Sequence, residues 1–397
     1  MEGTDDGRQG LKMKYFFSAG EHSGDMHAAA VIRHIKELDP EARFWGMGGP
    51  LMAREGAEIL YDPTKISTIG FWEAVKNYSR FKKYLKEFCR FFRKVRPDVI
   101  VWVDFGGFNV RLAEKANALG IPVVCIFPPT AWAYGKSRAA RLAKAVTHIV
   151  SVLPFEADFY REYGLKVTYI GHPLLDKVKL SIPPATWRQE KGVQEGETVV
   201  ALLPGSRLQE VMSLLPIMLE AANYLDEHRE GLKFFLPVAP TIDRRVIMEH
   251  FISFPKNLEL IDSDQGYNLM AAADFGVIAS GTSTLEAAIL GLPMIMIYQV
   301  SRLSAFIYRR LANREYKDGQ VLIALPNLVA GEMIIPELVQ EDLTVESLAA
   351  EMLKLHDNYN NTRETMVREL EKVREKLGTP EVMQRAAQLI VAEAQTR

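Results

Sequence analysis

Short apolar runs alternate with helix-like patterns along nearly the whole chain. Runs such as residues 99–103 and 275–279 are apolar on both faces, and about 10 to 15 residues of helical periodicity separate neighbouring runs. Strands of this kind belong to parallel sheets that helices cover on each side. The predicted strands are 15–19, 99–103, 122–127, 148–153, 167–170, 199–203, 233–238, 258–261, 275–279 and 294–298. The main predicted helices are 26–38, 109–119, 208–224 and 244–250.

The alternation pauses once, between residues 176 and 198. This stretch holds Pro183, Pro184 and a charged run with spaced glycines, so we interpret it as a linker. We therefore predict an α/β fold with two Rossmann-like, doubly wound domains facing a cleft, where ligands bind at the carboxyl ends of strands. The predicted divisions are a disordered tail at 1–11, an N-terminal domain at 12–180, a C-terminal domain at 181–360, and helices at 361–397 whose packing against the N-terminal domain is left open.

Composition and charge exclude several classes of protein. The 397 residues include 48 Lys and Arg against 50 Asp and Glu, and the net charge of −2 excludes a globally basic nucleic-acid-binding protein. Two cysteines, Cys89 and Cys125, are too few for a disulfide framework and favour a reducing, cytoplasmic location. No apolar run reaches the roughly 18 residues that span a bilayer, and the acidic start lacks the apolar core of a signal peptide. The eight histidines form no ligand cluster, so we expect no metal and no cofactor.

The first loop of interest follows the predicted strand 15–19. Gly20 and Gly24 permit a close approach of the backbone, and the next helix supplies free N–H groups. Glu21 and Asp25 would repel a phosphate, and their carboxylates suit the hydroxyls of a sugar better. The alternative is a tight turn with a helix cap.

A second loop, after strand 99–103, carries Asp104. An acidic residue at the end of a parallel strand points to the ligand edge of the sheet, where its carboxylate can act as a general base. The alternative is structural, because Asp104 or Asn109 could cap the helix that follows.

The third loop, after strand 199–203, reads Gly205-Ser206-Arg207. Its glycine and serine offer backbone and hydroxyl donors, and the guanidinium is a charged fork that matches a diphosphate. The alternative is a surface arginine after a turn.

The fourth loop, after strand 275–279, opens a helix with small and hydroxyl-bearing residues. The N–H groups and the dipole of such a helix start favour phosphate oxygens, and Glu286 one turn later can accept hydrogen bonds from ribose hydroxyls. The alternative is a capping box made by Ser283 and Glu286. The residues that we assign to this phosphate site are Ser280, Gly281, Thr282 and Ser283.

Residues 76–96 form a basic, amphipathic helix with nine basic residues, one acid and a net charge of +8. On a helical wheel the apolar face consists of Phe81, Leu85, Phe88, Phe92 and Val95, and the opposite face of Lys82, Lys83, Lys86, Arg90, Arg93 and Lys94. We interpret the charge excess as a surface for anionic lipid headgroups. Apolar residues shortly before it, Ile69, Phe71 and Trp72, extend this surface. The alternative is an ordinary helix that covers the sheet.

Eight motifs, in order, resemble those of the lipid-A-disaccharide synthase family of GT-B glycosyltransferases. The resemblance covers residues 15–353. The matching stretches are AGEHSGD (19–25), GMGGPLM (46–52), PDVIVWVDFGGFN (97–109), LPFE (153–156), GHPLLD (171–176), LLPGSR (202–207), SGTSTLEA (280–287) and LPNLVAG (325–331). The chain departs from the family pattern in three places. Gly107 replaces a second acid and leaves Asp104 as the only acid of its loop. The aromatic loop at 128–134 reads PPTAWAY instead of SPSVWAW, so that Tyr134 replaces a tryptophan, and a few extra residues around 317–323 precede LPNLVAG.

The resemblance implies an inverting transfer between two acylated sugars. The donor would be UDP-2,3-diacylglucosamine and the acceptor 2,3-diacylglucosamine 1-phosphate, giving the β-1′,6-linked lipid A disaccharide 1-phosphate and UDP. The resemblance also places Asn327 at the nucleotide site. In the mechanism that we expect, Asp104 is the base, and the first loop binds the acceptor through Gly20, Glu21, Ser23, Gly24 and Asp25. Family members lie peripherally on the cytoplasmic side of the inner membrane. No nucleic-acid partner is expected, and a homodimer is left open.

Two alternatives to this function remain. A UDP-sugar epimerase of the same two-domain build would not need the basic helix. A non-catalytic lipid-binding protein would not need Asp104 or Arg207.

Overall fold

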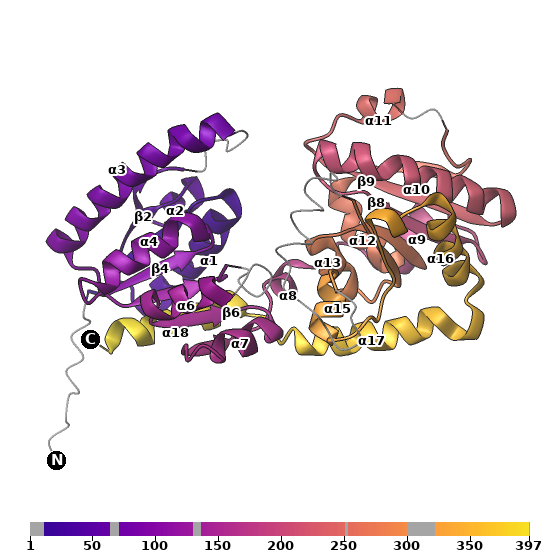
Figure 1. The fold of residues 1–397 in the computed structure, drawn as a ribbon. Coiled ribbons are helices and arrows are strands. Elements are labelled where there is room, and N and C mark those ends of the chain that lie inside the picture. Colours follow the sequence, from indigo (N-terminus) through magenta and orange to yellow (C-terminus); the bar gives the residue numbers. More distant parts are fainter. Residues whose placement is uncertain (1–11, 64–70, 130–135, 251–252, 300–321, 397) are drawn as a thin grey trace, which may run out of the picture. The chain divides into compact units, whose positions relative to one another are not determined.

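The computed structural model describes residues 12–63, 71–129, 136–250, 253–299 and 322–396, with only the backbone given for 71–79 and 136–138. The chain divides into two compact units, Met1–Pro173 with Thr379–Arg397, and Leu174–Gly378. Figure 1 labels many of the elements of both. Each unit is described by itself below.

The first unit contains a parallel sheet of seven described strands in the order β3-β2-β1-β4-β5-β6-β7. The strands are β1 (Lys14–Ala19), β2 (Arg43–Met47), β3 (Glu58–Tyr61), β4 (Val99–Val103), β5 (Val123–Ile126), β6 (His148–Ser151) and β7 (Val167–Tyr169). All but β2 and β3 were predicted from the sequence. β3 is the edge strand of the sheet, with side chains that stay partly exposed, and β2 is the strand beside it.

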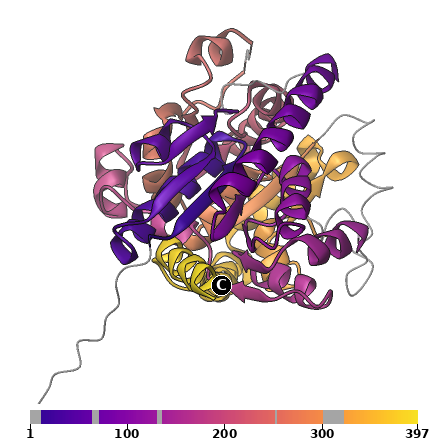
Figure 2. The same cartoon turned by 90° about the vertical axis from the view of Figure 1, so that its left-hand side faces the viewer.

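Helices cover both faces of this sheet. They are α1 (His22–Leu38), α2 (Pro50–Arg54), α3 (Phe71–Val95), α4 (Gly106–Asn117), α6 (Lys136–Ala145), α7 (Pro154–Arg161) and α18 (Val382–Gln395). Successive side chains of a strand point to opposite faces, so Tyr15 and Phe17 pack with α1 and α18, whereas Phe16 packs with α3. Figures 1 and 2 show α3 and α18 on opposite faces of the sheet. The core of this unit is therefore two apolar layers divided by the sheet.

The second unit repeats the same topology with six described strands in the order β10-β9-β8-β11-β12-β13. The strands are β8 (Thr198–Leu203), β9 (Leu232–Val238), β10 (Leu258–Asp262), β11 (Phe275–Ala279), β12 (Met294–Tyr298) and β13 (Glu337–Val339). The sequence missed only β13, a three-residue edge strand with half-buried side chains. In both sheets the strand order reverses beside the first strand, which is the topology of doubly wound nucleotide-binding folds. The predicted fold class is confirmed.

The helices of the second unit are α8 (Leu174–Lys177), α9 (Pro184–Glu190), α10 (Leu208–His228), α11 (Arg244–His250), α12 (Gly266–Ala272), α13 (Thr282–Ile289), α15 (Leu325–Ala330), α16 (Val345–Asp357) and α17 (Thr362–Lys376). Short 3-10 turns lie at Ser263–Gln265, Gln340–Asp342 and Tyr359–Asn361. Among the described helices of either unit, none is long and apolar enough to cross a membrane.

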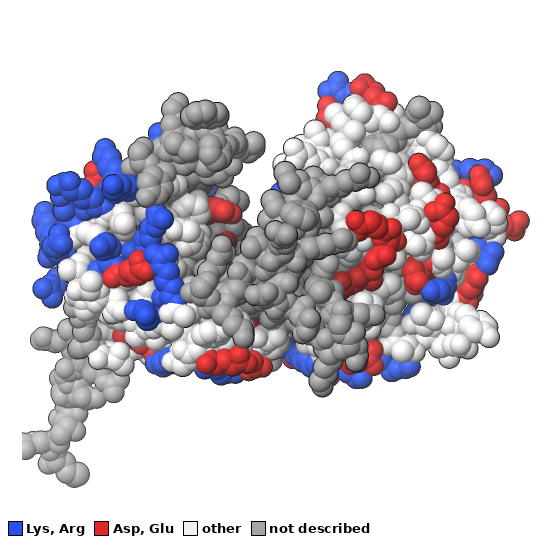
Figure 3. All heavy atoms as spheres, in the orientation of Figure 1, with Lys and Arg blue, Asp and Glu red and all other residues white. Residues whose placement is uncertain are grey.

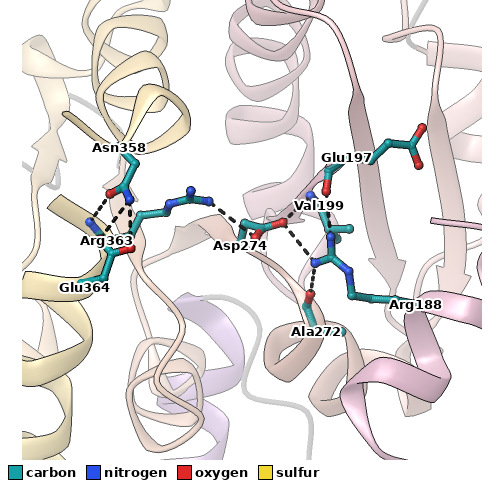
Figure 4. Close-up of polar contacts among 8 residues, drawn as sticks. All are labelled: Arg188, Glu197, Val199, Ala272, Asp274, Asn358, Arg363 and Glu364. Carbon is teal, nitrogen blue, oxygen red and sulfur yellow. Dashed lines mark hydrogen bonds and ion pairs between the residues drawn. The ribbon is translucent and has the colours of Figure 1, made fainter. Parts of the chain in front are cut away.

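The stretch interpreted as a linker is instead a packed part of the second unit. Trp187 of α9 is buried and makes an edge contact with Phe235, with 4.9 Å between the ring centroids. Arg188 donates to the carbonyl of Ala272 at 2.8 Å and pairs with Asp274 at 3.1 Å (Figure 4). The linker prediction was wrong, because Trp187 of this stretch is part of the core and Arg188 is paired within the second unit.

Asp274 connects several elements of the second unit, as Figure 4 shows. One of its carboxylate oxygens accepts the N–H of Val199 at 2.7 Å, and the other lies 3.5 Å from Arg363 of α17. Helix α17 therefore belongs with the second unit, and the chain passes to the first unit at Gly378 instead of at residue 360.

Of the two described helices in the predicted block 361–397, α18 packs on the first unit. Its buried residues Val382, Ala386 and Ile390 share a core with α1. Near its end, Glu393 accepts a hydrogen bond from His148 of β6 at 2.9 Å and forms an ion pair with Lys166. The predicted block of helices at 361–397 is thus split between the two units.

Candidate functional site

The third and fourth loops meet in the second unit. They follow β8 and β11, which are hydrogen-bonded neighbours at the point where the strand order reverses. Together with residues after β9 and β10 they line a pocket of about 580 Å³. The predicted residues found in its lining are Gly205, Ser206, Arg207, Ser280, Gly281, Thr282, Ser283 and Glu286. The structure therefore brings together two loops that lie about 75 residues apart in the sequence.

The β8 loop presents its polar groups to this pocket. Gly205 has φ +109°, and a side chain there would meet the carboxylate of Glu210 at 2.7 Å. Thr241 donates to the carbonyl of Ser206 at 3.0 Å and holds the loop in place. The Arg207 side chain is 81% exposed and pairs with Glu210 at 2.6 Å, so a diphosphate can reach the guanidinium.

Glu286 is held in place by two residues that the sequence analysis did not identify. Helix α13 starts after Gly281 without a side-chain cap, so the capping-box alternative for Glu286 is wrong. Its Oε1 instead accepts a hydrogen bond from the hydroxyl of Tyr267 at 2.8 Å, and the Nζ of Lys177 lies 3.8 Å away. Neither partner carries a local sequence signal, because each comes from a different helix.

Asn327 does not line the pocket. Its side chain is fully buried and donates to the carbonyl of Ile335 at 3.0 Å and to Glu337 at 2.7 Å. Its oxygen accepts the N–H groups of Ile334 at 2.8 Å and of Ile335 at 3.0 Å. Burial raises the pKa of Glu337, although the hydrogen bonds from Asn327 and the backbone oppose this effect. The Asn327 amide thus shapes the chain after α15, and its nucleotide contact stays a prediction from the family resemblance.

In the first unit, Asp104 lies exposed after β4. It and Phe105 have left-handed backbones, with φ values of +52° and +58°. Asn109 donates to the Asp104 carbonyl at 2.7 Å, and Trp102 donates to the same oxygen. The N-cap of α4 is Phe105, and no side chain caps the helix. Asn109 lies inside the helix. The alternative that Asp104 or Asn109 caps it is therefore wrong.

The first loop lies beside Asp104, because β1 pairs with β4. A side chain at Gly20 would collide with the ring of Phe105, and a Cβ at Gly24 would lie 3.4 Å from the Val103 carbonyl. Glu21 and Ser23 are exposed and can meet a ligand. Gly20 is therefore required by the close approach of the two loops, whereas a Cβ at Gly24 would only make a tight contact.

Asp25 takes a structural position. It is fully buried and accepts the N–H groups of Gly49 at 2.8 Å, Leu51 at 3.0 Å and Met52 at 3.1 Å. The N–H groups at the start of a helix have no partner within the helix, so Asp25 caps α2 and connects it to the first loop. Its contact with an acceptor stays a prediction.

Two histidines of the first unit, His27 and His172, were not among the predicted site residues. The ring of His27 lies 4.5 Å from that of Phe127, with an angle of 34° between their planes. His172 follows β7 and is buried, and burial, together with the nearby charge of His27, lowers its pKa to about 4. A neutral imidazole is therefore built into this unit.

Helix α3 has the two faces expected from its sequence. Phe88 and Phe92 are fully buried against Phe16, so the apolar face is core, as the sheet-cover alternative proposed. The basic residues of the other face are exposed, and Figure 3 shows them gathered over α3. They are Lys82, Lys83, Lys86, Arg90, Arg93 and Lys94. Ile69 lies outside the described residues, as do the side chains of Phe71 and Trp72.

Solved structures with the same fold include both glycosyltransferases and epimerases. MurG from Acinetobacter baumannii matches with a TM-score of 0.60 and 15% identity, over 96% of this chain and 100% of that one. A UDP-GlcNAc 2-epimerase from Neisseria meningitidis, bound to UDP-GlcNAc, matches with a TM-score of 0.56 and 12% identity, over 98% and 100%. These identities show the fold alone.

Sequence comparison is more specific. The lipid-A-disaccharide synthetase family model matches residues 15–392. The lipid-A-disaccharide synthase of Myxococcus xanthus is 35% identical over 94% of this chain and 95% of the relative, and that of Nitrosococcus oceani is 36% identical over 91% of each. The motifs, the two doubly wound units and these matches agree, and the chain belongs to the lipid-A-disaccharide synthase family.

Proposed function

We propose that the chain is an inverting glycosyltransferase that joins UDP-2,3-diacylglucosamine to 2,3-diacylglucosamine 1-phosphate. The products are the β-1′,6-linked disaccharide 1-phosphate and UDP. The observation that carries the proposal is the pocket in the second unit, where Arg207, the start of α13 and Glu286 converge in a chain of this family.

The donor's UDP would occupy that pocket. The diphosphate would lie between Arg207 and the N–H groups at the start of α13, and the ribose hydroxyls would donate to Glu286. Negative charge grows on the diphosphate as the glycosidic bond breaks, so donors already aimed at it stabilise the transition state.

Asp104 would act as the base. Its carboxylate takes the proton of the acceptor's 6-hydroxyl while that oxygen attacks the anomeric carbon of the donor. The carbon–oxygen bond to the diphosphate breaks in the same displacement, and UDP leaves with the electron pair. The exposed carboxylate on a backbone held by Asn109 and Trp102 supports this role.

The acceptor would lie against the first loop, where Glu21 and Ser23 are exposed beside Gly20. Both substrates carry acyl chains and reside in a membrane, so the enzyme must reach a lipid surface. We assign that contact to the basic face of α3, with Ile69, Phe71 and Trp72 as apolar neighbours. The excess of exposed cations on this face, with Glu87 as the one acid among them, supports an anionic partner on the cytoplasmic side of the inner membrane.

Mass spectrometry of the reaction tests this function. The purified chain is incubated with UDP-2,3-diacylglucosamine and 2,3-diacylglucosamine 1-phosphate in detergent micelles. We expect the disaccharide 1-phosphate and UDP in equal amounts, and neither in the absence of the acceptor. Conversion of the donor without an acceptor would favour an epimerase, and no reaction with any pair of acylated sugars would favour a binding protein.

A further inference from the structure

We propose that Tyr267 is a positioning residue that fixes Glu286 for the ribose hydroxyls, and that it thereby makes the donor pocket select ribonucleotides over 2′-deoxyribonucleotides. The inference rests on the proposed nucleotide site. It goes beyond that site because no motif in the sequence assigns a role to Tyr267.

The geometry begins with one hydrogen bond inside the pocket. Tyr267 lies on α12 and Glu286 on α13, and both side chains line the pocket wall. The Tyr267 hydroxyl donates to Oε1 of Glu286 at 2.8 Å. The second contact, from Lys177 at 3.8 Å, reaches the same oxygen. From the described part of the chain, no hydrogen bond reaches Oε2.

This arrangement leaves one carboxylate oxygen for a ligand. The Glu286 side chain is only 16% exposed and lines the pocket. Vicinal ribose hydroxyls are paired donors, and a carboxylate held in one orientation can accept from both. Without the phenol, Glu286 could turn toward Lys177 or toward solvent.

The phenol suits this task chemically. Burial, and then the charge of Glu286, raises the pKa of Tyr267 well above its usual value. The hydroxyl therefore stays protonated and acts as a hydrogen-bond donor to the carboxylate. A phenylalanine would fill the same space and remove only the donor.

Binding of UDP and 2′-deoxy-UDP to the full chain, measured by isothermal titration calorimetry, tests the proposal. Loss of one hydroxyl that pairs with a charged group lowers affinity by about 10-fold or more, so the wild type should prefer UDP by that factor. In Tyr267→Phe the preference should fall to about 3-fold or less, mainly through weaker binding of UDP. Tyr359→Phe, which alters a tyrosine that is 77% exposed and outside the pocket lining, should keep the wild-type preference.

A second variant separates positioning from a structural role. In the Glu286→Ala background, Tyr267→Phe should leave the UDP preference unchanged, because the phenol acts through the missing carboxylate. Equal weakening of both nucleotides by Tyr267→Phe, or an unchanged preference, would overturn the proposal while leaving the pocket in place. If the wild type bound no UDP, or if Arg207→Ala bound it normally, the nucleotide site itself would fail and the role of Tyr267 with it.

Discussion

Ser18 and Asn109 lie 91 residues apart in the sequence and are joined by a buried hydrogen bond of 2.5 Å between Oγ and Oδ1. The amide of Asn109 also donates to the carbonyls of Ser18 at 3.1 Å and of Asp104 at 2.7 Å. One asparagine thus connects the end of β1 to the backbone of the proposed base. This contact holds Asp104 and Phe105 in left-handed conformations, which cost about 1 to 3 kcal/mol each without such support.

Replacing Ser18 tests this connection. Ser18→Ala leaves Oδ1 of Asn109 buried without its donor, so the free energy of unfolding should fall by about 1 to 3 kcal/mol. Urea denaturation measures the change. Ser23→Ala, at an exposed position in the next helix, should alter stability by less than about 0.5 kcal/mol. Equal stability of both variants would mean that the buried bond contributes nothing.

Asp104→Asn keeps the shape of the proposed base and removes its basicity. Turnover should fall by about 10²-fold or more, while the affinity for UDP stays near that of the wild type. Disaccharide formation and UDP calorimetry measure the two quantities. The control is Asp158→Asn, since Asp158 is exposed on α7 with a side chain that is 74% accessible. Near-normal turnover of Asp104→Asn would remove Asp104 from the role.

Arg207→Lys keeps a positive charge but loses the planar fork that matches a diphosphate. We expect turnover to fall by about 10-fold or more and UDP binding to weaken, with a larger loss in Arg207→Ala. Arg245→Lys, at an arginine that is 83% exposed and not in the pocket lining, provides the matched control. If both lysine variants were fully active, a generic charge would suffice at position 207.

The basic face of α3 predicts salt-dependent binding to anionic vesicles. Attraction between exposed charges is screened beyond roughly 8 Å at physiological salt, so sedimentation with anionic vesicles should weaken as salt rises. Reversal of Lys82, Lys83, Lys86 and Arg90 to Glu should lower vesicle binding by at least about 10-fold and preserve the fold, because all four side chains are exposed.

The control for this experiment makes the same charge change elsewhere. Four exposed basic residues of α16 and α17 become Glu: Lys354, Arg368, Lys372 and Arg374. Vesicle binding should survive in this variant. Binding that ignores lipid charge, or that persists after the α3 reversals, would mean that α3 only covers the sheet.

Neutral His172 predicts a loss of stability in mild acid. Its pKa is about 4 in the folded chain and about 6.5 in an unfolded one, so the unfolded state binds more protons between these values. Stability should therefore fall as the pH drops from 6.5 to 4, by an amount on the order of 3 kcal/mol. Urea denaturation across this range measures the slope. His172→Gln should flatten it and exposed His250→Gln should not, whereas equal slopes in all three proteins would contradict the assignment.

The class of fold and the loops that make the site could both be predicted from the amino-acid sequence. Runs of apolar residues identified ten of the thirteen described strands, the edge strands β7 and β10 among them, and their parallel arrangement. The glycine loops could be located because each follows such a strand, and in doubly wound sheets those ends meet where the strand order reverses. The sequence did not identify β2, β3 and β13. Of these, β3 and β13 are edge strands without a fully buried side chain, and β2 begins with the exposed Arg43.

The pairing of polar side chains could not be predicted, because it depends on the packing of distant elements. The partnership of Tyr267 with Glu286 spans 19 residues, and that of His148 with Glu393 spans 245. The charged run around Arg188 has the composition of a linker, and the fold gives it Asp274 as a partner. Periodicity records which face of an element is buried. Periodicity does not predict which side chain of a distant element will be the hydrogen-bond partner, because that partner depends on how the layers pack.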